Sequence, residues 1–156
     1  ATVTRAADVA SITGTNFSDW FNPTEGTFVV EADTVATSGA GLNTSDGTTN
    51  NRVTVQLDNS FQGAVLVGGA AQASLDGGTL LSGFNRIAFA YKANDFALSL
   101  NGGAAVTDTS GSVPTGDRLI LGANGAGTAS FINGHIRRIS YYPSRLSNAQ
   151  LQALSA

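Results

Sequence analysis

The residues of this chain whose types best suit a chemical task are those that can recognise a sugar. Trp20 is the single tryptophan, and Asn22 follows it in a loop-like stretch. An aromatic ring packs against the apolar face of a pyranose, while planar polar groups hydrogen-bond its vicinal hydroxyls. Arg52, Thr54 and Gln56 share one face of a predicted strand and supply such groups. The sequence therefore predicts a carbohydrate site that contains Trp20, Asn22, Arg52 and Gln56.

Each part of this predicted site also has a structural explanation. Tryptophan is mostly buried on average, so packing at the edge of the fold is the more frequent role of a lone Trp20. The face that carries Arg52 and Gln56 also suits ordinary solvation, because antiparallel sheets commonly leave one face in water. Exposure of Trp20 beside a groove would favour binding, whereas burial would favour a structural role.

The adjacent Arg137 and Arg138 have three interpretations. Their charged ends extend into solvent at an irregularity of the last strand, which is the simplest reading. A second reading is contact with an anionic polysaccharide, because guanidinium binds carboxylate or sulfate through two hydrogen bonds. The third is pairing across the seam of an oligomer.

Catalysis and zinc binding lack the side chains that they need. His135 is the only histidine, and no His/Cys cluster or nucleophile motif surrounds it. Enzyme chemistry needs a constellation of groups rather than one, and zinc needs at least three protein ligands. We therefore expect a structural or surface histidine, no catalytic residue and no metal-binding residue.

The composition is that of a compact β-domain with few charges. Charged residues make up 12% of the 156-residue chain, and the formal net charge is −3. The eight basic residues form no stripe, which argues against nucleic-acid binding. No apolar run approaches the ~20 residues that span a bilayer, so we expect no membrane insertion. Cysteine is absent, which excludes disulfides and leaves the redox compartment open.

The hydrophobic pattern that must position these residues has a period of two, with turns rich in glycine. This alternation predicts β-strands near residues 26–32, 52–57, 86–92, 95–100, 118–122 and 130–142, with weaker strands before and between them. The predicted core contains Ile12, Phe28, Val30, Val53, Val55, Ile87, Phe89, Leu98, Leu119, Leu121, Ile136 and Ile139. Asn101-Gly102 predicts a two-residue turn, because both central positions of a type I′ turn need positive φ.

Three further features concern irregular segments. Strict alternation would place Ile136 and Ile139 on opposite faces, so we predict a β-bulge at Arg137–Arg138 that returns both isoleucines to the core. Ser147 and Gln150 match a capping box, which predicts a short helix over residues 148–154 whose Leu151 and Leu154 plug one end of the fold. The segment 37–51 is the most loop-like of the chain.

Two motifs near the C-terminus match a known pattern. The first is a closing strand of the form Gly-x-Ile-x-x-Val-x-Ile-Tyr, and the second is a following Leu-Ser-x-x-Glu/Gln-Ile/Leu. The positions that match them are Gly134, Ile136, Ile139, Tyr141 and Tyr142, then Leu146, Ser147, Gln150 and Leu151. From about Thr4 to the C-terminus the chain resembles the concanavalin A-like (laminin G-like) sandwich family. The strings TRAADVASITG, GHIRRI and YYPSRLSNAQLQAL are similar to modules of bacteriophage tail and receptor-binding proteins.

The resemblance implies an all-β, two-sheet antiparallel β-sandwich (a concanavalin A-like jelly roll) with a short C-terminal helical turn. We expect residues 1–156 to form one domain excised from a longer protein. The implied function is a non-catalytic carbohydrate-binding module of a phage tail fibre or receptor-binding protein, located on a virion or outside the cell. Its partner would be a polysaccharide or cell-surface glycan, with homo-oligomer formation through the parent protein. The alternative is a structural or assembly module without a sugar site.

The resemblance also extends to a wider superfamily, some members of which are glucanases. These enzymes have the signature Glu-x-Asp-x-x-Glu on one strand. Here Glu31 and Asp33 begin the pattern, and Ala36 replaces its last carboxylate. Glycoside hydrolysis needs a pair of carboxylates across the bond, so we expect no enzyme activity.

Laminin G-like domains often hold Ca²⁺ at a loop rim, and Asp46, Asn50, Asn51 and Asp76 offer oxygen ligands. Asp and Asn in glycine-rich loops are more often turn formers. We therefore expect no cofactor, with Ca²⁺ as the alternative.

Overall fold

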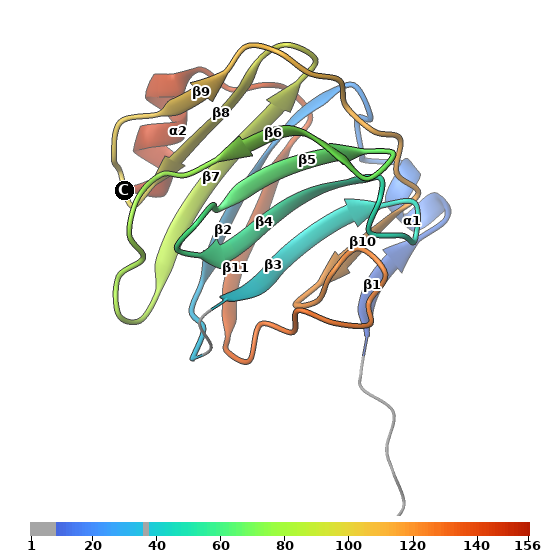
Figure 1. Ribbon diagram of the computed structural model, residues 1–156, viewed down its shortest axis with the longest axis horizontal. Coiled ribbons are helices and arrows are strands. Elements are labelled where there is room, and N and C mark those ends of the chain that lie inside the picture. Colours follow the sequence, from blue (N-terminus) through green and yellow to red (C-terminus); the bar gives the residue numbers. More distant parts are fainter. Residues whose placement is uncertain (1–8, 36–37) are drawn as a thin grey trace, which may run out of the picture.

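Two antiparallel sheets packed face to face make up the computed structural model, which describes residues 9–35 and 38–156 (Figure 1). The elements are β1 (Ala10–Thr13), α1 (Thr15–Ser18), β2 (Glu25–Ala32), β3 (Ser38–Ser45), β4 (Arg52–Asp58), β5 (Gly63–Val67), β6 (Ala70–Leu75), β7 (Asn85–Lys92), β8 (Phe96–Leu100), β9 (Val106–Asp108), β10 (Arg118–Leu121), β11 (Ile136–Tyr142) and α2 (Asn148–Ser155). One sheet has six strands in the order β1-β10-β3-β4-β5-β6, and the other has five in the order β11-β2-β7-β8-β9. The predicted two-sheet β-sandwich is confirmed.

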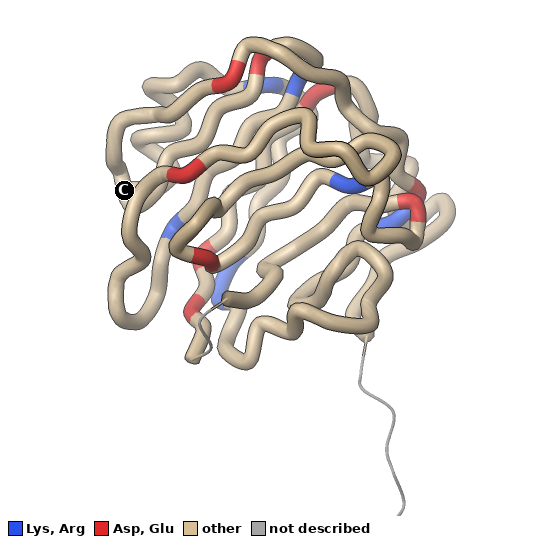
Figure 2. Tube along the Cα trace, in the orientation of Figure 1, with Lys and Arg blue, Asp and Glu red and all other residues tan. Residues whose placement is uncertain are grey.

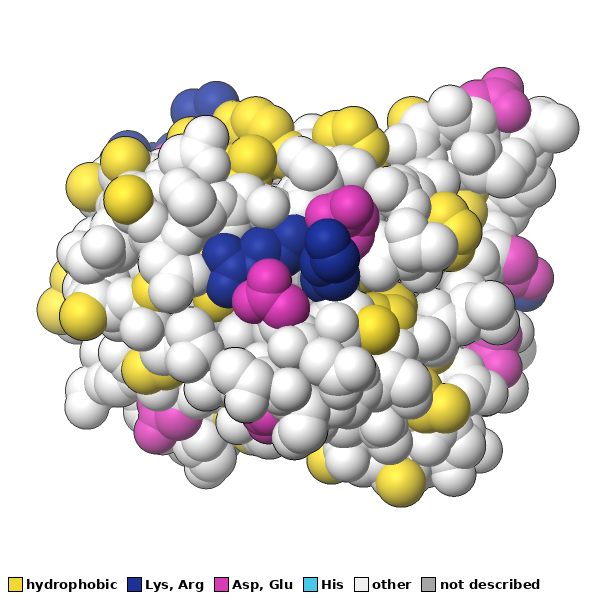
Figure 3. All heavy atoms as spheres, turned by 90° about the horizontal axis from the view of Figure 1, so that it is seen from above, with side chains coloured by type: hydrophobic (Ala, Val, Ile, Leu, Met, Phe, Trp, Pro, Cys, Tyr) yellow, Lys and Arg dark blue, Asp and Glu magenta, His cyan; other side chains and the backbone are white. Residues whose placement is uncertain are grey.

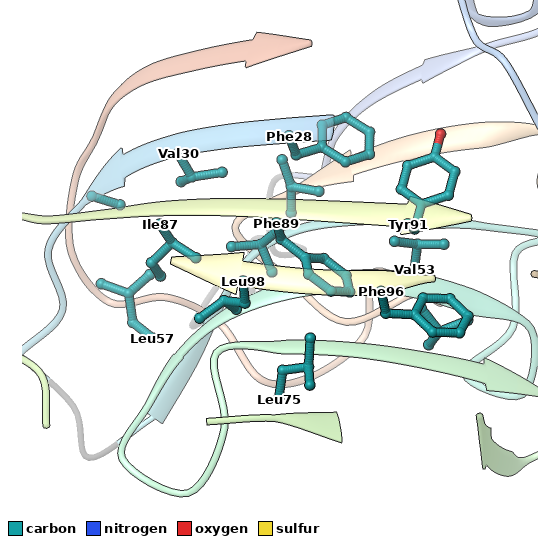
Figure 4. Close-up of a cluster of buried hydrophobic side chains, with 14 of the residues drawn as sticks. Phe28, Val30, Val53, Leu57, Leu75, Ile87, Phe89, Tyr91, Phe96 and Leu98 are labelled. Carbon is teal, nitrogen blue, oxygen red and sulfur yellow. The ribbon is translucent and has the colours of Figure 1, made fainter. Parts of the chain in front are cut away.

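The core fills the space between the sheets, as Figure 4 shows for the middle of the sandwich. Side chains from β2, β7 and β8 meet those from β4 and β6, and the alternation of each strand places every second residue inward. Of the predicted core residues, Phe28, Val30, Val53, Val55, Ile87, Phe89, Leu98 and Leu119 are buried. Ile12, Leu121, Ile136 and Ile139 are only partly buried against this core. They come from the edge strands β1 and β11 and from the end of β10, where the second sheet covers less of the side chain.

The last strand contains the predicted bulge. Ile136 pairs with Ala32 of β2, but Arg138 pairs with the next residue, Glu31, so Arg137 is the extra residue. Ile136 and Ile139 both pack against the core as a result. The strand is shorter than the predicted range 130–142, because it begins only at Ile136.

The prediction that 37–51 is a loop is wrong for most of its length. Ser38–Ser45 is β3, which lies between β10 and β4 in the six-stranded sheet; residue 37 lies outside the described part. The small residues of this strand are required by close neighbours: a Cβ on Gly39 would lie 2.6 Å from the Cα of Ile132. Tertiary packing therefore overrides the low β-propensity of the sequence.

Helix α2 has the predicted capping box, in which Ser147 Oγ accepts from Gln150 N and the Gln150 side chain accepts from Ser147 N. The prediction that Leu151 and Leu154 plug an end of the sandwich is wrong. Leu151 is buried on the outer face of the five-stranded sheet, against Val29, Ala88, Ala90 and Ala97. These small side chains leave a shallow apolar strip on β2, β7 and β8 that the helix covers.

Asn101 and Gly102 have φ values of 49° and 74°, as the predicted turn requires. The connection is nevertheless longer than a two-residue hairpin, because the pairing of β8 with β9 begins at Leu98 and Val106.

Charged residues are sparse over both sheets (Figure 2). Neither helix in the described part of the chain is long and apolar enough to cross a membrane.

Candidate functional site

A cavity of about 510 Å³ opens where β1 passes into α1, beside the turn that precedes β10. Its apolar side is formed by Phe17, Phe21 and Pro23, and its polar side by Thr13, Ser18, Asp117 and Arg118. Segments about 100 residues apart in the sequence therefore meet at one opening. We refer to it as the α1 cavity.

The apolar wall follows from a short helical turn. Gly14, with a φ of 62°, reverses the chain after β1, and its carbonyl accepts from the backbone nitrogens of Phe17 and Ser18. Phe17 is then only 1% exposed and stacks on Phe21, with ring centroids 4.4 Å apart. Phe21 keeps part of its surface accessible. Phe21, stacked on the buried Phe17, therefore gives this side of the cavity its accessible aromatic surface.

The polar wall is an ion pair between neighbouring residues. Arg118 Nε and Nη2 donate to the two carboxylate oxygens of Asp117, at 2.6 and 3.1 Å. The hydrogen bond from Arg118 lowers the pKa of Asp117, and the same bond raises the pKa of Arg118. Gly47 has a φ of 85°, and a Cβ there would lie 2.9 Å from Arg118 Cζ. The absence of a side chain at Gly47 therefore leaves room for the Arg118 guanidinium. Both groups are charged at neutral pH.

This arrangement suits the recognition of a polyhydroxylated ring. An aromatic surface takes the C–H face of a pyranose, and a planar donor-and-acceptor pair reaches vicinal hydroxyls. Among the described residues, Asp117 is the only carboxylate that lines the cavity, whereas glycoside hydrolysis commonly uses two.

Trp20 is half-buried and belongs to the packing behind the cavity. Its indole nitrogen donates to Asn16 O at 2.6 Å, and its ring lies edge-on to Phe17 and Tyr141, each at 5.1 Å between centroids. It does not line the α1 cavity. Trp20 is thus neither solvent-facing beside the cavity nor buried, and its role in binding stays a prediction.

Asn22 is held by hydrogen bonds within the protein. Its Nδ2 donates to Pro143 O at 2.9 Å, and its Oδ1 accepts from Thr24 N and Oγ1 at 3.0 and 2.8 Å. These bonds fix the loop between α1 and β2. Its side chain therefore already has partners on both the donor and acceptor sides.

Arg52 and Gln56 lie elsewhere, on β4 of the six-stranded sheet, and the structure does not bring them to Trp20 and Asn22. Between them, Thr54 is fully buried. Arg52 Nη1 donates to Thr49 O at 2.7 Å, and burial lowers the pKa of Arg52. This face is thus neither an ordinary solvated face nor part of one site with Trp20.

The other candidate positions have partners within the chain. Asp33 accepts from the backbone nitrogen of His135 at 2.6 Å, and their side chains approach to 3.1 Å. Ala36, the residue that breaks the glucanase pattern, lies outside the described residues. Asp46 accepts from Thr48 and Asn51, which lowers its pKa.

Asp76 accepts from Gly78 N and closes its own turn. Over the described ranges, no group of three or more His, Asp or Glu side chains is placed to hold a metal ion.

Phe17, Phe21, Asp117 and Arg118 were missed at the sequence level. The string NFSDWF did carry a signal, because aromatic residues at 17, 20 and 21 share one side of a helical turn. No local signal links that string to the Asp-Arg pair.

No protein-family model and no curated protein matches this sequence. Solved structures do match the fold. The CBM40 module of the Ruminococcus gnavus IT-sialidase, bound to α2,3-sialyllactose, is 20% identical, with a TM-score of 0.68 over 85% of this chain and 83% of that chain. The NanB sialidase from Streptococcus pneumoniae is 17% identical, with a TM-score of 0.67 over 92% of this chain and 26% of that chain.

Domains LG4-5 of the mouse laminin α1 chain are 14% identical, with a TM-score of 0.57 over 90% of this chain and 40% of that chain. At these identities the likeness concerns the fold. The two packed sheets and these neighbours together show that the chain has the concanavalin A-like β-sandwich fold.

Proposed function

We propose that this chain is a non-catalytic carbohydrate-binding module and that the α1 cavity is its glycan site. The observation that carries the proposal is the pairing, in one cavity, of the Phe17–Phe21 wall with the Asp117–Arg118 ion pair. Arg118 Nη1 has no hydrogen-bond partner among the described residues, so it is available to a ligand hydroxyl. A neighbour in fold, the CBM40 module, binds sialyllactose, which supports the same class of ligand.

The wider setting is a proposal of the same kind. The resemblance to phage tail and receptor-binding modules supports a role on a virion appendage or outside the cell. A single shallow site gives a Kd of about 10 μM to 1 mM, because few groups are desolvated and a flexible ligand is immobilised. Several copies on one appendage raise the overall avidity without new contacts.

The experiment is a calorimetric titration of the chain with a panel that includes α2,3-sialyllactose, lactose and neutral polysaccharides. Asp117→Asn and Phe21→Leu are expected to weaken the best ligand about tenfold or more, because each removes one side of the site. Asp108→Asn is the control for loss of one carboxylate charge, since Asp108 of β9 accepts from Ser110 N and lies outside the cavity. Absence of binding by the wild-type chain at millimolar glycan would instead favour a structural module without a sugar site.

A further inference from the structure

A second cluster of charged side chains lies outside the α1 cavity, on the outer face of the five-stranded sheet. Arg86 of β7 and Arg137 of β11 form ion pairs with one carboxylate, Glu31 of β2, and Arg138 of β11 lines a hollow together with Glu31 and Arg86. We call these four residues the arginine cluster. Two hollows adjoin it, and both are lined by Glu31 and Arg86.

The cluster contains more positive than negative charge. Arg137 Nη1 lies 2.7 Å from Glu31 Oε1, and Arg86 Nε lies 3.3 Å from Glu31 Oε2, so two guanidinium groups share one carboxylate. Arg138 Nε donates to Ser140 Oγ at 3.2 Å and has no carboxylate partner in the part of the chain that the structure describes. The side chains of Arg86 and Arg137 are each about half exposed, at 48% and 58%.

Other cations of the molecule are neutralised in a different way. At the end of the sandwich where β7 turns into β8, Lys92 lies 3.8 Å from Glu25, and Arg145 Nη2 lies 2.9 Å from Asp95. Figure 3 looks onto the molecule from above and shows basic side chains lying directly against acidic ones. Each of these two cations has its own carboxylate, unlike the arginines of the cluster.

The positions of the arginines are fixed by the backbone and by packing. Arg137 is the extra residue of the bulge, so two consecutive arginines come to the same region of β11 instead of alternating. The Arg137 guanidinium also lies 3.6 Å from the centroid of the Phe84 ring. A cation held over an aromatic face keeps its remaining donors directed outward at little entropic cost.

The two hollows add the other features of a ligand site. One of about 80 Å³ is lined by Arg138, Ser140 and Tyr142, and the Tyr142 hydroxyl has no hydrogen bond among the described residues. The other, of about 360 Å³, is lined by Arg137, with Leu81 and Phe84 as its apolar part. Leu81 is 61% exposed, which is unusual for a large hydrophobic residue of this chain.

We propose that the arginine cluster binds the carboxylate or sulfate group of an acidic saccharide. Guanidinium groups recognise these planar or tetrahedral anions through paired hydrogen bonds, and the adjacent hydroxyls and apolar side chains suit a sugar ring. An acidic peptide is a poorer fit, because the bulge at Arg137 interrupts the edge of β11 that an added strand would need. This site shares no residue with the α1 cavity, so it stands independently of the proposed function.

The test is a calorimetric titration at low ionic strength with an oligogalacturonate, a chondroitin sulfate oligosaccharide and a neutral maltooligosaccharide. The acidic ligands are expected to bind, and the neutral one to bind at least about tenfold more weakly. Preference between the two acidic ligands identifies carboxylate or sulfate as the group recognised. Raising the salt to about 0.5 M is expected to weaken binding, because exposed charges are then screened.

Arg138→Gln is the informative variant, since Arg138 has no carboxylate to leave unpaired and the fold is expected to survive. It is expected to lose about tenfold in affinity for the acidic ligand. Lys92→Gln is the matched control for loss of one positive charge, and Asp117→Asn separates this site from the α1 cavity. Three results would overturn the proposal. The first is an equal loss of affinity in Arg138→Gln and Lys92→Gln, and the second is tighter binding of poly-glutamate than of either acidic saccharide. The third is equal affinity for the acidic and the neutral ligands.

Discussion

The hydroxyl oxygens of Tyr91 and Tyr141 lie 3.2 Å apart beneath the loop that joins α1 to β2. Tyr91 donates to the carbonyl oxygen of Asn22 at 2.9 Å, and Asn22 N donates to Tyr141 Oη at the same distance. Burial raises the pKa of both tyrosines, so both hydroxyls keep their protons at physiological pH. Strands β7 and β11 thereby hold the loop that carries Phe21 to the α1 cavity.

Removing the Tyr91 hydroxyl is expected to destabilise the protein. Tyr91→Phe leaves the Asn22 carbonyl without its main donor and should reduce the free energy of unfolding by about 1–2 kcal/mol. Tyr142→Phe is the control, because the Tyr142 hydroxyl has no partner among the described residues, and its effect should be near zero. Urea unfolding followed by tryptophan fluorescence measures both. Equal effects of the two variants would contradict the role assigned to the Tyr91 hydroxyl.

Gly26 is expected to resist substitution because of the same pair. A Cβ on this residue would lie 2.5 Å from Tyr91 Oη and 2.8 Å from Tyr141 Oη. Gly26→Ala should therefore cost about 1–3 kcal/mol of stability through overpacking. In the double variant with Tyr91→Phe the cost should be smaller than the sum of the single effects, because the closest atom is gone. Strict additivity in thermal or urea unfolding would argue against this cause.

Trp20 is expected to act mainly on stability. Its half-buried ring contacts Phe17 and Tyr141, so Trp20→Ala should lower the free energy of unfolding by about 1–3 kcal/mol. The affinity of the folded variant for a glycan in the α1 cavity should change little, because Trp20 does not line it. A stable Trp20→Ala protein with lost glycan affinity would instead support the stacking role predicted from the sequence.

Glu31 is expected to make stability depend on acid pH. The hydrogen bond from Arg137 lowers its pKa from the ordinary value of 4.5, against the opposing effect of burial, and Arg86 lowers it further. Because the Glu31 pKa is lower in the folded than in the unfolded state, ionised Glu31 stabilises the fold at pH values above the ordinary pKa of 4.5. This stabilisation is lost as the pH falls from about 4.5 through the lowered pKa of the folded state. The stability difference between wild type and Glu31→Gln should thus narrow on acidification. A difference that stays constant with pH would contradict it.

The sequence predicted those parts of the fold that follow from a pattern of residues within a single strand or helix. Val53, Val55 and Leu57 alternate with polar residues, and the strand they predicted is β4. The bulge at Arg137 followed from the spacing of two isoleucines, and the capping box from Ser147 and Gln150. These features depend on neighbours within a few residues.

The parts that were missed depend on partners far along the chain. The segment SGAGLNTS shows no hydrophobic alternation, yet it is a strand inside the six-stranded sheet because it pairs with β10 and β4. The backbone of Ile132 leaves room only for glycine at position 39. The α1 cavity likewise arises only when Phe21 meets Arg118. Trp20 is the rarest aromatic of the chain, but the ring that lines the cavity is that of its neighbour, Phe21.

An NMR titration can locate the bound glycan residue by residue and so decide whether it lies in the α1 cavity. Uniformly ¹⁵N-labelled Arg138→Gln protein, in which the arginine cluster is weakened, would be titrated with the tightest glycan of the panel. We expect the amide signals of Phe17, Phe21, Asp117 and Arg118 to shift first and to saturate together. Shifts that centre on Arg52 and Gln56 of β4, or no shift at millimolar glycan, would contradict it.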